Sequence, residues 1–225
     1  MVSLWNHLFL LYNKTGDDME KIIKIENLSL ILNDKQIFKN FNLEIDKNEK
    51  ILLNSKSGSG KTTLLNILFG FFYVESNVFI DNNKLNSKNI EKIREKISYI
   101  PQNIFLLDMK VIDFIKYIFS LKQYRKRELD ILKLKEYLEK FQLDKNILDN
   151  FTNKLSGGEK QRLIIVIAIL LDKDIWLLDE PTSAIDSETK KIVIENILRL
   201  DKTMIIVSHD KEWLEYENIK IISWW

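Results

Sequence analysis

The chain contains Ile51-Leu-Leu-Asn-Ser-Lys-Ser-Gly-Ser-Gly-Lys-Thr-Thr63, an apolar run that passes into a loop rich in Ser and Gly. A segment with helical character, Thr62–Phe69, follows it. A strand, a glycine-containing loop and a helix in this order are the context that a phosphate-binding loop requires. Gly58 and Gly60 let backbone N–H groups turn toward a phosphate, and the helix N-terminus adds the positive end of its dipole. We therefore expect this loop to bind phosphates.

The predicted nucleotide-binding residues of the loop are Ser55, Lys56, Ser57, Gly58, Ser59, Gly60, Lys61, Thr62 and Thr63. The Lys61 ammonium can reach the β- and γ-phosphates of ATP, and the Thr62 hydroxyl can bind Mg²⁺. The pattern G-x-x-x-x-G-K-[ST] has glycine where this chain has Ser55. Serine can serve there if its φ is negative, and it costs stability if the turn requires a positive φ.

Ile175-Trp-Leu-Leu-Asp-Glu180 reads as a buried strand that ends in two carboxylates. A carboxylate at the carboxyl end of a parallel strand, beside a phosphate loop, can hold Mg²⁺, and the next one can polarise the attacking water. We assign Asp179 to the metal and Glu180 to the catalytic base. The alternative interpretation is that Asp179 and Glu180 are two acidic loop residues after a core strand, without a catalytic role.

Leu155-Ser-Gly-Gly-Glu-Lys-Gln-Arg162 precedes an almost wholly apolar helix that runs to Leu171. Ser156, Gly157 and Gly158 at a helix start offer a hydroxyl and free backbone N–H groups, which form a second anion site. Two such helix starts on one chain are hard to place on one nucleotide. They are compatible if each chain's second site closes on the ATP of its partner.

The motif at residues 155–162 resembles the signature of the ATP-binding cassette (ABC) ATPases. The other family elements follow in the expected order. Ser98-Tyr-Ile-Pro-Gln102 resembles the Q-loop, and Leu177-Leu-Asp-Glu-Pro-Thr182 resembles the Walker B strand. Ser183-Ala-Ile-Asp186 resembles the D-loop, and Ile206-Val-Ser-His-Asp210 resembles the switch-histidine segment. The match runs from about residue 20 to the C-terminus.

The resemblance implies roles for individual residues. Gln102 would ligate Mg²⁺, sense the γ-phosphate and link a helical insertion to the core. Ser156 and Gly158 would contact the γ-phosphate of the ATP on the other protomer, and Asp186 would pass between the two sites. His209 would hold the γ-phosphate and the attacking water, so the predicted catalytic residues are Glu180, His209 and Lys61, and the predicted metal ligands are Thr62, Gln102 and Asp179.

The chain departs from the family at several positions besides Ser55. Leu32 falls near the position of the aromatic side chain that usually stacks on adenine, although Phe38 could take that place. Asn48 stands where glycine is usual, and Ile167 replaces a common arginine. We expect Trp224 and Trp225 to form a docked or disordered end and not a site.

The fold class expected is α/β: a P-loop NTPase of the ABC cassette type, with a wound, mostly parallel sheet, an inserted helical subdomain and an N-terminal antiparallel β part. Residues 1–18 form an extension that is either frayed or loosely docked, or else an amphipathic anchor or the end of a linker from a membrane segment. Residues 19–225 form the ATP-binding domain. Strands are expected at 22–26, 51–53, 78–80, 97–100, 175–178, 204–207 and 219–222, and helices at 62–69, 189–200 and 211–216. The helical subdomain covers about 103–155, with helical spacing at 113–121 and 128–141.

Composition narrows the class of function. Lys+Arg 34 against Asp+Glu 33 leaves a net charge of +1, which argues against nucleic acid as a partner, and the absence of cysteine excludes thiolate chemistry. No apolar run reaches the ~18–20 residues that span a bilayer. Together with the resemblance, these features lead us to expect a cytoplasmic ATP-hydrolysing subunit that energises a transporter. It would form a homodimer or a heterodimer and lie on the inner face of the membrane through permease subunits. The alternatives are a soluble ABC ATPase, such as one for iron–sulfur cluster assembly, and a weakened nucleotide-binding regulatory subunit.

Overall fold

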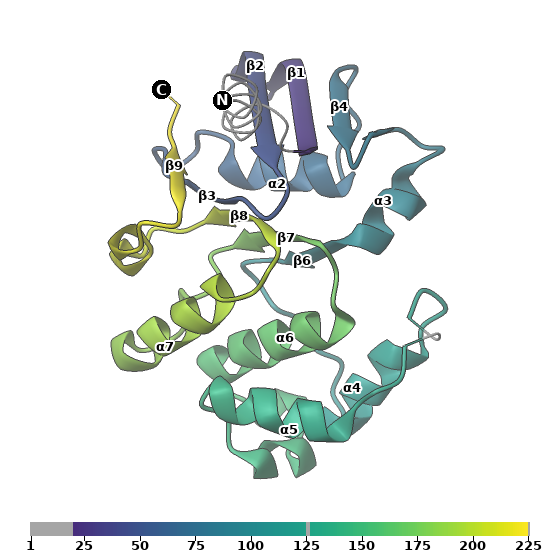
Figure 1. The fold of residues 1–225 in the computed structure, drawn as a ribbon, viewed down its shortest axis with the longest axis vertical. Coiled ribbons are helices and arrows are strands. Elements are labelled where there is room, and N and C mark those ends of the chain that lie inside the picture. The colour runs from purple at the N-terminus through teal and green to yellow at the C-terminus, as the bar shows by residue number, and fades with distance from the viewer. Residues whose placement is uncertain (1–19, 125–126, 225) are drawn as a thin grey trace, which may run out of the picture.

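The computed structural model describes residues 20–124 and 127–224, so the predicted extension over residues 1–18 lies outside it. The elements in chain order are β1 (Lys21–Leu32), β2 (Lys35–Asp46), β3 (Lys50–Leu53), α2 (Lys61–Phe69), β4 (Asn77–Ile80), β5 (Asn83–Lys84), α3 (Ile90–Lys96), β6 (Ile97–Ile100), α4 (Val111–Ser120), α5 (Ile131–Lys140), η1 (Lys145–Asp149), η2 (Thr152–Lys154), α6 (Gly157–Leu171), β7 (Ile175–Asp179), α7 (Ser187–Leu198), β8 (Thr203–Val207), η3 (Lys211–Glu215) and β9 (Lys220–Ile222). Figure 1 shows β1, β2 and β4 at one end, the central strands in the middle, and α4 to α7 at the other end.

The central sheet is parallel and has the strand order β6-β7-β8-β3-β9. Along β7, Ile175 and Leu177 face the core shared with α2 and the N-terminal strands, whereas Trp176 and Leu178 face the core shared with α6 and α7. Because both faces are covered, the strands are continuous apolar runs, and that pattern made them predictable.

The register of this sheet brings three loops to one edge. Leu53 of β3 pairs with Val207 of β8, and Val207 pairs with Asp179 of β7. The carboxyl ends of these strands are therefore level. Ligands bind at the carboxyl edge of open parallel sheets, so this edge is where the site is expected.

The N-terminal sheet is antiparallel, with the order β2-β1-β4-β5, as the fold class predicted. The sequence did not predict β2 as a strand. Register shifts interrupt its pairing with β1, and Asn27 and Asn40 take positive φ values of 52° and 48° within the two strands. These irregularities break the alternation of apolar and polar residues by which a strand is recognised.

The described residues of the segment 111–154, which omit 125 and 126, form α4, α5, η1 and η2, and their only strand-like pairing is the bridge between Lys110 and Phe151. The guanidinium of Arg162 in α6 joins this region to the core by donating to the carbonyls of Phe141 and Gln142, at 3.3 and 2.7 Å. Apolar residues of α4 and α5 share one core with α6. The helical region is thus packed directly on the helix that follows the signature motif.

Two helix boundaries differ from the sequence-based prediction because side chains cap the first turns. Asp130 accepts hydrogen bonds from the N–H groups of Leu132 and Lys133, so α5 begins at Ile131 and not at Glu128. Asp186 accepts from Thr189 N, so α7 begins earlier, at Ser187. Helix α3 was not predicted.

In the described ranges, 20–124 and 127–224, no helix is both long enough and apolar enough to cross a bilayer.

Candidate functional site

The predicted phosphate loop connects β3 to α2 at the carboxyl edge of the sheet. Gly60 immediately precedes α2 with φ 95°, a conformation that only glycine adopts at low cost. A Cβ atom there would also collide with the side chain of Ile37 and lie 3.2 Å from the ring of Phe38. Strand β2 therefore closes against the back of the loop, and glycine is required at this position.

Ser55 takes a negative φ, since it is not among the non-glycine residues with positive φ. Serine adopts such a conformation without strain. The absence of glycine from the first position of the motif therefore does not distort the loop.

The Lys61 side chain folds back into the loop. Its Nζ donates to the carbonyl oxygens of Ser55 at 2.6 Å and Lys56 at 3.1 Å, and the residue is only 6% exposed. Burial lowers the pKa of Lys61, and the charges of Glu180 and Asp179 oppose that shift. The ammonium is thus held at the mouth of the loop, near both predicted carboxylates.

Thr62 and Asp179 meet at the first turn of α2. The Thr62 hydroxyl donates to Asp179 Oδ1 at 3.2 Å. Burial raises the pKa of Asp179, while the bond from Thr62 and the charge of Lys61 lower it. Since a raised pKa means that the folded state disfavours the ionised carboxylate, this charge costs stability at any pH above that pKa. A cation bound at this point would remove the cost.

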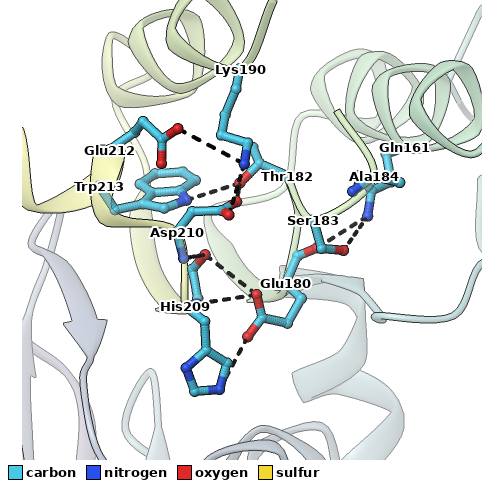
Figure 2. Close-up of polar contacts among 11 residues, drawn as sticks. Gln161, Glu180, Thr182, Ser183, Ala184, Lys190, His209, Asp210, Glu212 and Trp213 are labelled. Carbon is cyan, nitrogen blue, oxygen red and sulfur yellow. Dashed lines mark hydrogen bonds and ion pairs between the residues drawn. The ribbon is translucent and has the colours of Figure 1, made fainter. Parts of the chain in front are cut away.

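Glu180 adopts an uncommon backbone conformation for a non-glycine residue, with φ 50°. Its Oε2 accepts bonds from Ser208 Oγ at 3.4 Å and from the N–H of His209 at 3.2 Å. Burial raises the pKa of Glu180, and the bond from the His209 backbone opposes the shift. Figure 2 shows the imidazole of His209 beside the carboxylate, with Nε2 3.7 Å from Oε1.

These groups surround one cleft of about 280 Å³. Its walls are Ile37, Ser57, Gly58, Gly60, Lys61, Thr62, Thr63, Gln102, Asp179, Glu180, Val207 and His209. Nearly every residue predicted to contact nucleotide or metal is in this set. The exceptions are Ser55, Lys56 and Ser59, which belong to the same loop but do not line the cleft.

The signature residues lie at a different place. Gly157 lines a second depression together with Gln161, Ser183 and Ala184, and Gln102 is common to both. Ser156 caps α6 in a reciprocal capping box: its Oγ accepts from Glu159 N, and Glu159 Oε2 accepts from Ser156 N. The exposed Ser156 hydroxyl keeps its proton free to donate to an anion.

Gly158 packs closely against the backbone of the D-loop. A Cβ atom at this position would lie 2.8 Å from the backbone oxygen of Ala184. That oxygen belongs to the backbone and cannot rotate away. Glycine at position 158 is therefore required by packing, whatever it binds.

Gln161 is a buried residue beside the predicted base that the sequence reasoning missed. Its Nε2 donates to the Glu180 carbonyl at 3.1 Å and to Ser183 Oγ at 3.0 Å, and its Oε1 accepts from Ala184 N at 2.9 Å. It is 4% exposed. The signature helix thereby holds the backbone of the predicted base, and the position of Gln161 within the signature motif was the available signal.

A second group of missed residues supports the segment that carries His209 (Figure 2). Asp210 accepts from Thr182 Oγ1 at 2.6 Å and from Lys190 Nζ at 2.7 Å. The indole Nε1 of Trp213 donates to Thr182 Oγ1 at 3.1 Å. These contacts tie η3 and the loop before it to the residues that follow Glu180. No local pattern indicated them.

A family model described as ABC transporter matches residues 38–183. The chain belongs to the ABC transporter family. The match includes the phosphate loop, Gln102, the signature motif and both carboxylates at the end of β7.

Individual members of the ABC transporter family agree with this assignment. The chain is 34% identical over 204 residues to the ergothioneine transport ATP-binding protein EgtV of Helicobacter pylori (strain G27), covering 86% of this chain and 92% of that protein. The dimeric structure of MJ0796, a bacterial ABC transporter cassette, superposes with a TM-score of 0.74 at 28% identity, covering 89% of this chain and 94% of that chain. A post-hydrolysis dimer of MJ0796 bound to ADP and Pi has a TM-score of 0.70 at 29% identity, covering 84% and 88%. Against several longer relatives, the chain spans 18–32% of their length.

The structure accounts for two departures from the usual ABC pattern. Asn48 has φ 64°, and asparagine is among the few residues that tolerate this conformation in place of glycine. Ile167 is 3% exposed in the core around α6, where an apolar side chain is the ordinary choice.

Leu32 lies at the end of β1, partly exposed and paired with Lys35. The other aromatic considered for the adenine, Phe38, is 0% exposed and packs 5.2 Å from Phe41. Its ring would have to leave the core to stack on a base, and neither Leu32 nor Phe38 lines the cleft.

Proposed function

We propose that this chain binds and hydrolyses ATP as the nucleotide-binding subunit of an ABC transporter, and that ATP closes two such subunits into a dimer. The observation that carries the proposal is the cleft of about 280 Å³ at the carboxyl edge of the sheet. A phosphate loop, two buried carboxylates and a histidine face this one space. In this proposal residues 19–225 are the ATP-binding domain, with a helical subdomain at about 103–155.

The phosphate loop is suited to a triphosphate. Lys61 would exchange its bonds to the loop carbonyls for bonds to the β- and γ-phosphates, and the backbone N–H groups of residues 58–63 would hold the remaining oxygens. The N-terminus of α2 adds a positive dipole end to the same site. Binding and charge neutralisation are thus supplied by adjacent residues.

The residues around Thr62 fit Mg²⁺. This ion takes oxygen ligands and commonly uses one or two protein groups together with phosphate and water. Thr62 Oγ1 and Asp179 Oδ1 are already neighbours, Gln102 lines the same cleft, and Asp179 is buried. Bound there, Mg²⁺ would neutralise charge on the phosphates.

Glu180 is the group placed to activate water. Its carboxylate would accept a proton as the water oxygen bonds to the γ-phosphorus and the bond from that phosphorus to the β,γ-bridging oxygen breaks, giving ADP and phosphate. Burial raises the pKa of Glu180, which makes the carboxylate a better proton acceptor. His209 would hold the γ-phosphate and the water in line.

The signature residues support dimer closure. Ser156, Gly157 and Gly158 lie outside the nucleotide cleft, so they are available to the ATP of a second chain, and the MJ0796 cassette has been determined as a dimer. Asp186 would lie between the two sites. The negative φ of Ser55 speaks against a weakened regulatory subunit, because the loop needs no positive φ there.

Transport coupling follows from the relatives and is part of the proposal. EgtV is named as a transport ATP-binding protein, and it matches this chain over 92% of its length. The partners would be transmembrane permease subunits, and the chain would lie on the inner face of the membrane through them.

We expect the purified chain to release phosphate from ATP with Mg²⁺ and to lose this activity when the metal is chelated. When the chain is purified from detergent-solubilised membranes, we expect a multi-span membrane protein in stoichiometric amount. The absence of phosphate release in both preparations would overturn the ATPase. A soluble scaffold as the co-purifying protein would favour the ABC ATPases outside transport.

Selection of adenine over guanine is expected to be weak. Leu32 can bury apolar area against a base but lacks the ~1–3 kcal/mol that base–aromatic stacking supplies. GTP should therefore compete with ATP within about tenfold, a gap of ~1.4 kcal/mol. Leu32→Tyr should tighten ATP binding with little change in kcat.

The measurement is competition of ATP against GTP on both proteins, with Leu132→Tyr as control because Leu132 is 81% exposed in the helical region. A strong ATP preference in the wild type that Leu32→Tyr leaves unchanged would show that other residues recognise the base.

A further inference from the structure

Strand β9 lies against the strand that leads into the phosphate loop. Its residues Lys220, Ile221 and Ile222 pair in parallel with Ile51, Leu52 and Leu53 of β3. The pairing continues one step further, because Asn54 N donates to the carbonyl of Ile222 at 2.9 Å. The chain after β9 therefore runs alongside the start of the loop.

Trp224 makes two hydrogen bonds to this loop, one near each end. Its backbone N–H donates to Ser55 Oγ at 2.9 Å, and its indole Nε1 donates to the carbonyl oxygen of Ser59 at 3.0 Å. These partners are separated from Trp224 by 169 and 165 residues in the chain. The contact is thus a tertiary one, made to the loop by a segment that is remote in sequence.

The indole is also part of the core behind the loop. Trp224 is 8% exposed, and its ring centroid lies 5.4 Å from that of Phe41 and 6.3 Å from that of Phe38. Phe38 is the ring that lies against Gly60. Trp224, Phe38 and Gly60 therefore form a continuous packed layer beneath the loop.

A second lysine holds another carbonyl of the loop. Lys35 Nζ donates to the Gly58 carbonyl at 3.1 Å, and this bond, unlike those from Lys61 to the Ser55 and Lys56 carbonyls, would stay in place when Lys61 turns to the phosphates. The indole of Trp224 does the same for Ser59. A carbonyl oxygen that turned toward a phosphate would repel it, so donors that hold these oxygens leave the N–H groups to face the anion.

We propose that Trp224 is a positioning residue for the phosphate loop, which it fixes in the anion-binding conformation by holding the Ser55 side chain and the Ser59 carbonyl. Ser55 stands where glycine is usual, and its hydroxyl accepts the bond from Trp224 N. Glycine has no side chain and could not accept this bond. This inference rests on the proposed function, that the loop binds the phosphates of ATP. Trp224 contacts the loop and not the nucleotide, so it acts on affinity and leaves the chemical groups unchanged.

The test is the Kd for ATP, measured by calorimetry, and the KM and kcat of the same proteins. Trp224→Phe keeps an aromatic ring in the core and removes only the indole donor, so we expect the Kd and KM to rise about 3–10-fold with kcat at saturating ATP unchanged within twofold. Trp224→Ala should raise both further. Ile221→Ala is the control on β9, because Ile221 is 50% exposed and its side chain takes no part in the loop contacts.

A double-mutant cycle with Ser55→Gly separates positioning from general damage. If Trp224 and Ser55 act as one unit, the double variant Ser55→Gly/Trp224→Ala should raise the Kd by less than the product of the two single changes. Thermal melting without nucleotide identifies any variant that loses its fold, and Trp224→Phe is the variant that then decides. If the wild type binds ATP and Trp224→Phe binds it with the same Kd, this inference is wrong and the proposed function stands. If the folded wild type does not bind ATP, both the inference and the proposed function are wrong.

Discussion

Glu180→Gln should hydrolyse Mg-ATP about 10²–10⁴-fold more slowly than the wild type, because a positioned proton acceptor contributes about that factor. ATP binding should survive. The glutamine side chain keeps the shape of glutamate and one acceptor oxygen for the bonds now made by Ser208 Oγ and His209 N. It also removes a carboxylate whose pKa burial has raised, so the substitution should not destabilise the fold.

The same variant should accumulate as a dimer with Mg-ATP, because the ATP hydrolysis that reopens the dimer is slowed. Sedimentation with and without nucleotide measures this directly. Glu91→Gln is the matched control, since Glu91 is an exposed carboxylate in the first turn of α3. A variant that binds ATP and stays monomeric at high protein concentration would contradict closure of this chain on its own nucleotides.

Lys61→Ala should weaken ATP binding by about 10²-fold or more. Hydrogen bonds to charged groups contribute about 1.5–3 kcal/mol each, and Lys61 is placed to make them to two phosphates. Its Nζ lies 2.6 Å from Ser55 O and 3.1 Å from Lys56 O, at the mouth of the cleft that also holds Thr62. Calorimetric titration with Mg-ATP gives the affinity.

Lys39→Ala is the control for the loss of one positive charge, because Lys39 is exposed on β2. Thermal melting without nucleotide checks the fold of Lys61→Ala, which also loses two bonds within the loop. Unchanged affinity in a folded Lys61→Ala protein would place the nucleotide elsewhere on the molecule.

Local sequence carried most of the information about the fold. The buried strands β3, β7 and β8 are short apolar runs, and such runs are predictable because both faces of a parallel sheet are covered. The loop after β3 and the carboxylates after β7 are likewise contiguous motifs, and the structure places them on one edge as the α/β fold class requires. Family membership, too, could be predicted from short motifs in a particular order.

Strand β2 and helix α3 are among the elements that were not predicted, because their local pattern is weak. Strand β2 alternates buried and exposed residues only over 41–45, and the positive φ of Asn40 and the register shifts before it interrupt the period of two over the rest. Helix α3 has seven residues, of which only Ile93 is buried, too few to show a helical stripe. Both gain their stability from neighbours in the fold and not from their own sequence.

The second layer of the site depended on tertiary structure alone. Gln161 reaches the backbone of Glu180 across 19 residues, Thr182 reaches Asp210 across 28, and Trp224 reaches Ser55 across 169. Each of these contacts depends on the register of parallel strands and on the packing of a helix over them. A hydrogen bond acts over about 3 Å, whereas a sequence pattern reports only the preferences of adjacent residues. The phosphate loop and the two carboxylates can therefore be predicted from local motifs. Which side chains hold them in place is determined only when distant segments of the chain pack together.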